Sequence, residues 1–454
     1  MRTSLRSKLG RESKIVKVVV KIGILGLGTV GTGTVQILQD PVGRHHLLQS
    51  VEIQRVGVRS IDKPRTVDLP SELVTTDLDS IVSDPEIDII VELLGGIEPA
   101  RSLMLKAIEH GKHVVTANKA VIARFGDEIF TAANNAGVYV MLEAAVGGGI
   151  PVIQPLKQSL GVNRIGRVTG IINGTTNYIL SRMTSEGGEF SDILTDAQKL
   201  GYAEADPTAD VDGLDAGDKI AILASLAFGG RINRDDVYCE GIRKISATDI
   251  AYADKLNFVI KLLAIAERVE GGAVSVRVHP TFVPKDRPLA NVNGVYNAIL
   301  VEGEPLGQVM LFGPGAGAGA TASAVVSDIL AIVGVMQSKP SREDAVTSPN
   351  TALHPLLSCA HTDYSRMAPL SSLRSSFYVR FLCLDVPGVI GKLGTRFGSH
   401  NVSIESIVQT GFQGDRAEIV VVTHDVSEGD FESALAEIRQ LDSIDSIPSI
   451  VRVL

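Results

Sequence analysis

Two lysines and an aspartate have a spacing that could support proton transfer to a bound substrate. Asp215 and Lys219 are four residues apart in a helix predicted over 214–228, so their side chains share one face. Lys119 follows a strand predicted over 113–116, at the carboxyl edge where doubly wound sheets bind ligands. An exposed Asp–Lys pair of purely structural character has the same spacing and adds little stability. Both interpretations stay open on spacing alone.

Acidic residues are dense ahead of that helix, which could indicate a calcium loop. In the required register Gly213 is sixth, so Thr208 is first and Lys219 is twelfth, where a glutamate is needed. The sequence also has no Walker-type phosphate loop, no His-Glu-x-x-His and no Gly-x-Ser-x-Gly. Calcium-loop, kinase and hydrolase interpretations therefore fail.

A glycine-rich turn between a buried strand (16–24) and a helix (31–39) predicts a dinucleotide site. Glycines there allow a sharp turn, close approach of the backbone to a pyrophosphate, and tight packing of helix on strand. The N–H groups at the helix start then hold the phosphates. The residues expected to bind the cofactor are Gly26, Gly28, Thr29, Val30 and Gly31. A structural turn without a ligand is the alternative.

The end of the next strand, 51–58, indicates which dinucleotide binds. An acid at this position accepts a hydrogen bond from the ribose 2′-hydroxyl of NAD, whereas an arginine receives the 2′-phosphate of NADP. Arg59 occupies the position, and the next acid, Asp62, lies beyond the strand. We therefore expect NADP(H) to be preferred and NAD(H) to be the second cofactor. A solvated surface arginine is the alternative.

Short β-branched runs alternate with helical segments up to residue 150, which predicts a parallel, doubly wound α/β sheet. The expected strands are 16–24, 51–58, 87–92, 113–116 and 138–143. After Pro151 the pattern predicts an α+β unit with a mixed sheet. Its expected strands are 165–172, 274–278, 295–301 and 308–312, with helices over 214–228 and 249–268. A helix over about 321–336 follows a glycine-rich turn.

The C-terminal part begins with a segment rich in Ser, Pro and Thr, 338–376, which we interpret as a linker. A β-α-β-β-α-β series follows, in the ferredoxin-like order and long enough for an independent domain. Its expected strands are 377–384, 402–410, 417–423 and 450–453, with helices from Pro387 and from Asp430. Asp385 before Pro387 at the first helical position predicts a good helix start.

Composition limits the class of protein. The 454 residues suggest roughly three domains, and 44% hydrophobic with 21% charged residues is a globular balance. A net charge of −9 argues against nucleic acid as a partner. Cys239, Cys359 and Cys383 are too scattered for a disulfide scaffold or a cysteine zinc site.

No apolar run approaches the ~18 residues of a membrane-spanning helix, so we expect a cytoplasmic protein without membrane contact. The basic, polar residues 1–14 lack the apolar stretch of a secretory signal. They are interpreted as a disordered lead-in, with an organelle transit peptide as the alternative.

Several segments together resemble homoserine dehydrogenase, over nearly the whole chain. They are Gly-Leu-Gly-Thr-Val-Gly at 26–31, Thr-Ala-Asn-Lys at 116–119, and the segments 143–151, 173–180, 201–207, 212–215 with Lys219, and 313–323. The C-terminal unit, through 385–389 and 401–404, looks like an ACT domain. With no aspartate-kinase segment ahead of the nucleotide part, the monofunctional form is expected. The implied division is a Rossmann NADP-binding domain (15–150, completed by a helix at about 318–337), a substrate-binding and dimerisation domain (151–317), a linker (338–375) and an ACT domain (376–454).

The resemblance implies NAD(P)H-dependent interconversion of L-aspartate 4-semialdehyde and L-homoserine, a step toward threonine, methionine and isoleucine. Lys219 would donate the proton, and Lys119, near the nicotinamide, is the rival donor. Glu204 and Asp215 would bind the substrate, while Gly201 and Gly317 would approach the cofactor. Burial or a neighbouring cation would lower the pKa of a lysine from ~10.4 and speed proton transfer.

Three further features follow from the resemblance. Glu143, with the backbone carbonyls of Val146, Gly148 and Ile150, looks like a monovalent cation site for Na⁺ or K⁺. A buried glutamate that caps a helix is the alternative. The ACT-like unit implies inhibition by L-threonine, or else a role in dimerisation alone, and a homodimer or homotetramer is expected.

Two other functions remain to be separated by assay. An amino-acid sensor on an inactive dehydrogenase core would have lost its polar positions, yet the lysines and acids named above are present. Aspartate-semialdehyde dehydrogenase needs a nucleophilic cysteine, and no cysteine here lies in a matching context.

Overall fold

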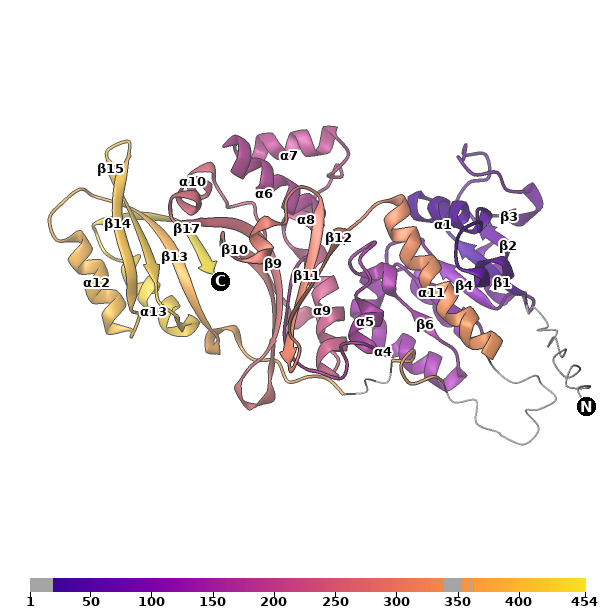
Figure 1. Cartoon of the computed structure of the whole chain (residues 1–454). Coiled ribbons are helices and arrows are strands. Elements are labelled where there is room, and N and C mark those ends of the chain that lie inside the picture. Colours follow the sequence, from indigo (N-terminus) through magenta and orange to yellow (C-terminus); the bar gives the residue numbers. More distant parts are fainter. Residues whose placement is uncertain (1–18, 339–352, 360, 362) are drawn as a thin grey trace, which may run out of the picture.

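The computed structural model describes residues 19–338, 353–359, 361 and 363–454. They form three units in a row along an elongated molecule (Figure 1), with the N-terminal unit at one end and the C-terminal unit at the other. The predicted lead-in over 1–14 and residues 339–352, 360 and 362 of the predicted linker over 338–375 lie outside the described residues. The linker prediction is wrong at both ends, because Ser338 is still in the last turn of a helix and Arg374 is already in a strand.

A six-stranded parallel sheet forms the N-terminal unit, in the order β3-β2-β1-β4-β5-β6. This order confirms the predicted doubly wound, Rossmann-type fold. The predicted strand over 138–143 is shorter in the structure, because Glu143 begins the 3₁₀ turn η3 (Glu143–Ala145). The strands are β1 (Val20–Leu25), β2 (Val51–Gly57), β3 (Val74–Thr75), β4 (Ile89–Glu92), β5 (His113–Thr116) and β6 (Val140–Met141).

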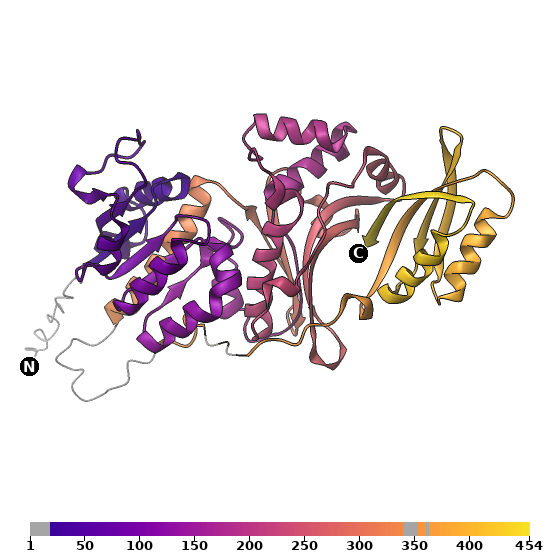
Figure 2. The ribbon, with the colours of Figure 1, turned by 180° about the vertical axis from the view of Figure 1, so that it is seen from behind.

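Helices cover both faces of this sheet (Figures 1 and 2). One layer contains α1 (Thr29–Gln39) and α11 (Ala318–Ser338), and the other contains α2 (Leu78–Ser83), α3 (Ala100–Glu109) and α4 (Lys119–Ala136). Along β4, Ile89 and Val91 pack into the first layer and Ile90 into the second, as expected of a strand buried on both faces.

α11 comes from beyond the middle unit and completes the core of the N-terminal unit. Among the described residues it is also the one helix long and apolar enough to cross a membrane, so the expectation of no such run is wrong. About half of its most apolar stretch is buried against α1 and the sheet. Gly33 allows the close contact, since a Cβ there would lie 2.7 Å from the carbonyl oxygen of Ala318. Core packing therefore explains the apolar sequence.

The middle and C-terminal units share one mixed sheet, in the order β12-β11-β7-β9-β10-β17-β13-β15-β14. The middle unit contributes β7 (Arg164–Ile171), β9 (Phe258–Arg268), β10 (Val274–Pro284), β11 (Tyr296–Glu304) and β12 (Gly307–Pro314). The C-terminal unit contributes β13 (Arg374–Cys383), β14 (Ile404–Gln413), β15 (Arg416–Thr423) and β17 (Ile444–Val453). The short strands β8 (Tyr238–Cys239) and β16 (Val426–Ser427) pair with β10 and β13. The helices of the middle unit are α5 (Ile153–Lys157), α6 (Gly174–Glu186), α7 (Phe190–Lys199), α8 (Thr208–Val211), α9 (Leu214–Phe228) and α10 (Ala247–Lys255).

The helix predicted over 249–268 is wrong in its second half. α10 ends at Lys255, Asn257 has a left-handed φ of 66°, and β9 follows. β9 lies between β7 and β10 and is buried along most of its length. A run that is apolar at nearly every position has no period that separates a buried helix from a central strand.

The C-terminal unit has the predicted β-α-β-β-α-β order, with α12 (Val389–Ser399) and α13 (Glu428–Ile438) as its helices. The predicted helix start at Pro387 is wrong. Gly388 is the N-cap at a φ of 89°, a geometry that glycine adopts readily, and α12 begins one residue later. α13 begins two residues before the predicted Asp430, because the Ser427 side chain caps it by accepting from the Asp430 N–H.

The C-terminal unit is joined to the middle unit through the sheet and through buried charges. β17 is longer than the predicted 450–453 and pairs in parallel with β10. Arg380 of β13 lies 2.9 Å from Asp249 of α10 and 3.1 Å from Glu418 of β15, and all three side chains are buried. Because charges inside a protein must be paired, each unit holds groups that the other needs.

Candidate active site

Two lysines from different units hold the two oxygens of one carboxylate. Lys119 Nζ lies 2.8 Å from Oδ1 of Asp215, and Lys219 Nζ lies 2.7 Å from Oδ2. The structure therefore brings together three of the predicted site residues. The alternative of an exposed ion pair is wrong, because the side chain of Asp215 is 7% exposed and that of Lys219 12%.

Local sequence explains how these side chains are placed. The side chain of Asn118 caps α4 by accepting from the Val121 N–H, so Lys119 is the first helical residue. α9 begins after Gly213, whose φ is 78°, and Asp215 lies in its first turn, where the helix dipole favours a carboxylate.

Asn173, two residues after β7, also belongs to the site, although it was not among the predicted site residues. Its Nδ2 donates to Oδ2 of Asp215 at 2.9 Å and to Oδ1 of Asp210 at 2.7 Å. Its side chain also caps α6 through the Thr176 N–H. The position of Asn173 at a predicted strand end, directly before Gly174, was the signal that could have identified it.

The pKa values of the site follow from this geometry. Burial alone raises the pKa of the Asp215 carboxyl, but the charges and hydrogen bonds of Lys219 and Lys119 outweigh burial and hold that pKa well below its usual range. Burial alone lowers the pKa of Lys119, yet Asp215 outweighs it and leaves the pKa above the ordinary value. The expected lowering is therefore wrong for Lys119, which keeps its proton at neutral pH.

Lys219 has one hydrogen-bond donor left for a ligand. Its Nζ donates to Asp215 and, at 2.8 Å, to the carbonyl oxygen of Ile172. An ammonium group has three donors, so these two contacts fix the side chain and, among the residues that the structure describes, leave one N–H without an acceptor. The site thus presents protons at the boundary between the N-terminal and middle units.

The glycine turn lies beside this boundary, at the carboxyl end of β1. A Cβ on Gly26 (φ 106°) would lie 2.7 Å from the Leu93 carbonyl oxygen, and one on Gly31 would lie 2.2 Å from that of Gly26. A Cβ on Gly28 would meet nothing within 4 Å. The fold itself requires glycine at 26 and 31, whereas the space above Gly28 is open.

The N–H groups of Thr29 and Val30 are in the first turn of α1, where intrahelical acceptors are lacking. Together with the open space at Gly28 they fit a bound pyrophosphate. Arg59 is exposed two residues after β2, the neighbour of β1, and so lies at the same edge of the sheet.

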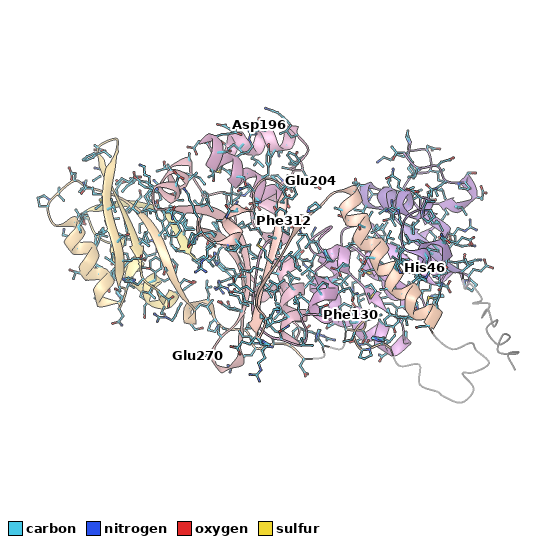
Figure 3. All side chains as sticks on the ribbon, viewed as in Figure 1. His46, Phe130, Asp196, Glu204, Glu270 and Phe312 are labelled. Atoms are coloured by element: carbon cyan, nitrogen blue, oxygen red, sulfur yellow. The ribbon has the colours of Figure 1, made fainter. Side chains whose placement is uncertain are left out.

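The other predicted residues lie around the boundary without joining the lysine–aspartate cluster. Gly201 (φ 77°) follows α7 and Gly317 (φ 119°) precedes α11, and a Cβ on either would meet nothing within 4 Å. Figure 3 shows Glu204 on the side of the middle unit that faces the N-terminal unit. Its side chain is exposed, and among the described residues no hydrogen bond or ion pair links it to Asp215 or the lysines.

The carboxylate of Glu143 caps a helix, which is the alternative given above. It accepts the N–H groups of Val152 at 2.6 Å, Ile153 at 2.8 Å and Gln154 at 2.8 Å, at the start of α5. The backbone N–H of Glu143 donates to Asp328 of α11 at 2.7 Å. Glu143 therefore links η3, α5 and α11.

The turn after Glu143 offers oxygen ligands. Val146, Gly148 and Ile150 are buried, and in the part of the chain that the structure describes no hydrogen bond ends on their carbonyl oxygens. Buried carbonyl oxygens of this kind fit a hard monovalent cation. Within the same residues, no group of three or more His, Cys, Asp or Glu side chains could hold a metal ion.

Comparison with known families agrees with this geometry. The family model described as homoserine dehydrogenase matches residues 151–330, and the one described as its NAD-binding domain matches 26–143. The ACT domain model matches 377–443.

Two individual proteins are similar over almost the full length of this chain, and a third is similar over about 70% of it. A homoserine dehydrogenase of Synechocystis is 66% identical over 438 residues, which cover 96% of this chain and 99% of that protein. The crystal structure of a homoserine dehydrogenase from Thiobacillus denitrificans has a TM-score of 0.86 at 40% identity, covering 96% of this chain and 98% of that one. A hyperthermophilic archaeal homoserine dehydrogenase in complex with NADPH has a TM-score of 0.59 at 28% identity, covering 71% and 99%.

Proposed function

The chain belongs to the homoserine dehydrogenase family of oxidoreductases that act on a CH–OH group, and from this premise we propose that it reduces L-aspartate 4-semialdehyde to L-homoserine with NADPH. The pathway role we assign is the biosynthesis of threonine, methionine and isoleucine. The observation that supports the proposal best is the Lys119–Asp215–Lys219 cluster, which lies where a dinucleotide fold meets the substrate unit.

In this proposal a bound NADPH supplies the hydride to the aldehyde carbon. Negative charge then develops on the aldehyde oxygen, and the free N–H of Lys219 donates the proton to it. Lys119 adds a second positive charge, and Asp215 holds both ammonium groups in place. Glu204, on the facing loop, binds the ammonium group of the substrate.

The cofactor site consists of the glycine turn, Lys119, Gly201 and Gly317, with Arg59 as the residue that selects NADP. An exposed arginine at the strand edge is suited to a 2′-phosphate. The archaeal relative described with NADPH supports the same preference.

We assign a monovalent cation, Na⁺ or K⁺, to the turn after Glu143. The buried, unused carbonyl oxygens of Val146, Gly148 and Ile150 support this assignment. The carboxylate of Glu143 is already engaged with α5, so its part is to hold the turn in shape. The cation orders the connection between the first two units.

The ACT unit binds L-threonine as a feedback inhibitor in this proposal. A pocket lies between the turn that precedes α12 and strands β14 and β15. It presents Asp385, whose Oδ1 lies 3.5 Å from Nε2 of Gln409, beside apolar groups such as Val389 and Ile419. A carboxylate and an amide beside apolar carbons suit the ammonium, hydroxyl and methyl groups of threonine.

We propose a homodimer or homotetramer, in the cytoplasm, that assembles through the outer strands of the middle unit. β12 is an edge of the shared sheet, and Phe312 on it is 55% exposed and stacks on the exposed ring of Tyr296 of β11. Edge strands with exposed aromatic residues favour pairing with a second copy. The domain division given by the resemblance is retained as part of this proposal.

The test is homoserine-dependent reduction of NADP⁺, followed by absorbance of NADPH, with NAD⁺ in parallel. A sensor protein gives no reduction under any condition. Aspartate-semialdehyde dehydrogenase gives reduction with aspartate semialdehyde and phosphate but none with homoserine. Absence of homoserine-dependent turnover overturns the proposal.

A further inference from the structure

Glu92 is a buried carboxylate that the mechanism above does not use. It is the last residue of β4 and is 0% exposed, at the carboxyl edge of the sheet. β4 lies next to β1, where the strand order reverses and dinucleotides bind. Among the described residues no ion pair joins Glu92 to a cation, although burying an unpaired carboxylate is costly. The residue therefore needs an explanation beyond packing.

Two hydrogen bonds hold the carboxylate. Its Oε1 accepts from the Leu94 N–H at 2.8 Å, and its Oε2 accepts from Oγ1 of Thr116 at 2.6 Å. Burial raises the pKa of the Glu92 carboxyl, and these hydrogen bonds act against that rise. Thr116 is the last residue of β5, so Glu92 fixes the relative position of two neighbouring strand ends.

The contacts continue from Thr116 to the start of α4. Thr116 Oγ1 accepts from the backbone N–H of Asn118 at 2.9 Å. The Asn118 side chain caps α4 through the Val121 N–H at 3.2 Å and donates to the carbonyl oxygen of Gly96 at 2.7 Å. Gly96 lies four residues after Glu92, so the hydrogen bonds close a ring between the two strand ends. Lys119 is the next residue in the chain.

We propose that Glu92 is a positioning residue that acts through Thr116 and Asn118 to fix Lys119 opposite Asp215. The inference rests on the proposed function of Lys119 and extends it to a residue that touches neither substrate nor cofactor in that proposal. Reacting groups in a catalytic site must be held in a narrow geometry, and a displacement of about 1 Å costs up to about 100-fold in rate. A rigid ring of hydrogen bonds at the helix start provides that precision.

The matched pair Thr116→Val and Thr116→Ser tests the relay, since valine keeps the shape and loses the hydroxyl, while serine keeps the hydroxyl. We expect Thr116→Val and Glu92→Gln to lower kcat about tenfold or more, with KM for homoserine within about twofold. The fall in kcat should be much smaller in Thr116→Ser than in Thr116→Val. Thr34→Val, at an equally buried threonine of the same unit that bonds only within its own helix, is the control for loss of a buried hydroxyl.

A double variant with Lys119 distinguishes a positioning role of Glu92 from a role in overall stability. In the Lys119→Ala background, Glu92→Gln should cause little further loss of kcat, because the group it positions is gone. Full multiplicative losses, or equal activity of Thr116→Val and Thr116→Ser, overturn the inference. Full activity of Lys119→Ala also overturns the inference, but it does not contradict the proposed dehydrogenase activity of the protein. Only a wild-type enzyme without homoserine-dependent turnover overturns the proposed function itself.

Discussion

Lys119 and Asp215 form an ion pair across the boundary between the N-terminal and middle units, with 2.8 Å between Nζ and Oδ1. Lys119 begins α4 beside the dinucleotide sheet, and Asp215 lies in the first turn of α9 in the substrate unit. Together with the ion pair between Arg124 of α4 and Asp218 of α9, at 3.0 Å, this contact holds the start of α4 against α9.

Replacement of the lysines tests their roles. We expect Lys219→Ala to lower kcat by about 10²–10⁴-fold, because it removes the group that we propose as the proton donor. Steady-state kinetics with homoserine and NADP⁺ measures the loss, with the exposed Lys199→Ala as control. Near-normal turnover of Lys219→Ala contradicts its assignment, and a larger fall in Lys119→Ala identifies Lys119 as the donor.

Two glycines of the turn should respond differently to alanine. Gly28→Ala adds a methyl group in open space, so we expect the thermal midpoint to stay close to that of the wild type while KM for NADPH rises about tenfold or more. Gly31→Ala places its methyl group 2.2 Å from the Gly26 carbonyl oxygen and should lower the midpoint. Thermal unfolding and kinetics of both variants check this contrast. The same behaviour in both variants contradicts it.

Arg59 should determine cofactor preference. In Arg59→Asp the 2′-phosphate loses its cation and meets a negative charge, so the ratio of kcat/KM for NADP⁺ over NAD⁺ should fall at least about tenfold. Arg44→Asp, at an exposed arginine outside the predicted site, controls for the change of net charge. An unchanged ratio in Arg59→Asp means that the arginine is a surface residue without this role.

Lys261 of β9 gives a pH dependence of stability. The residue is 2% exposed, and within the described residues its ammonium group donates to neutral oxygens, of Asn177, Val292 and Asn293. Burial lowers its pKa to about 8. Between pH 8 and the unfolded value of ~10.4 the unfolded chain binds more protons, so stability should rise with pH, by up to about 3 kcal/mol.

Below pH 8 both states carry the proton and the full cost of burial is present. The measurement is the urea midpoint by circular dichroism, since the chain has no tryptophan. As the pH rises from 8 to 10, the urea midpoint of the wild type should rise relative to that of Lys261→Met. A flat or falling difference would show that the lysine stays protonated when folded.

Removal of the ACT unit should not leave a working enzyme. Excision of 376–454 removes Arg380 from beside Asp249 and the strand β17 from beside β10, so a surface that is buried in the full chain meets water. We expect aggregation or a sharply lower thermal midpoint. This differs from the behaviour of an independent domain, for which excision would spare catalysis.

A single replacement is therefore the better test of regulation. Asp385→Ala should raise the threonine concentration for half inhibition about tenfold or more while turnover without threonine falls far less. Threonine inhibition that is the same in Asp385→Ala and wild type removes this pocket as the effector site. A wild type that threonine does not inhibit leaves the unit with a structural role only.

The sequence was sufficient wherever local pattern determines structure. β5 and α9 have the predicted bounds, because a short β-branched run and a helix between two glycines are recognisable without tertiary context. β9 was predicted as a helix because a continuous apolar run has no periodicity that distinguishes a helix from a strand. The burial of Asp215 could not be predicted from the sequence either, since its partner Lys119 comes from a distant part of the chain.

Asn173 and Glu92 show the same limit at the level of the site. Each is a common polar residue at a strand end, and only its partners after folding give it a role. The glycines of the turn could be predicted from the sequence, because glycine is the residue type that a positive φ or a close backbone approach requires.

α11 has a consequence for synthesis on the ribosome. It supplies Val325, Ile329 and Ile332 to the layer that covers β1 and β4, yet it follows the whole middle unit in the chain. The nascent nucleotide fold must therefore wait, with one face of its sheet partly bare, until translation has passed residue 338. The bare face is open to aggregation and to chaperones for the whole of this interval.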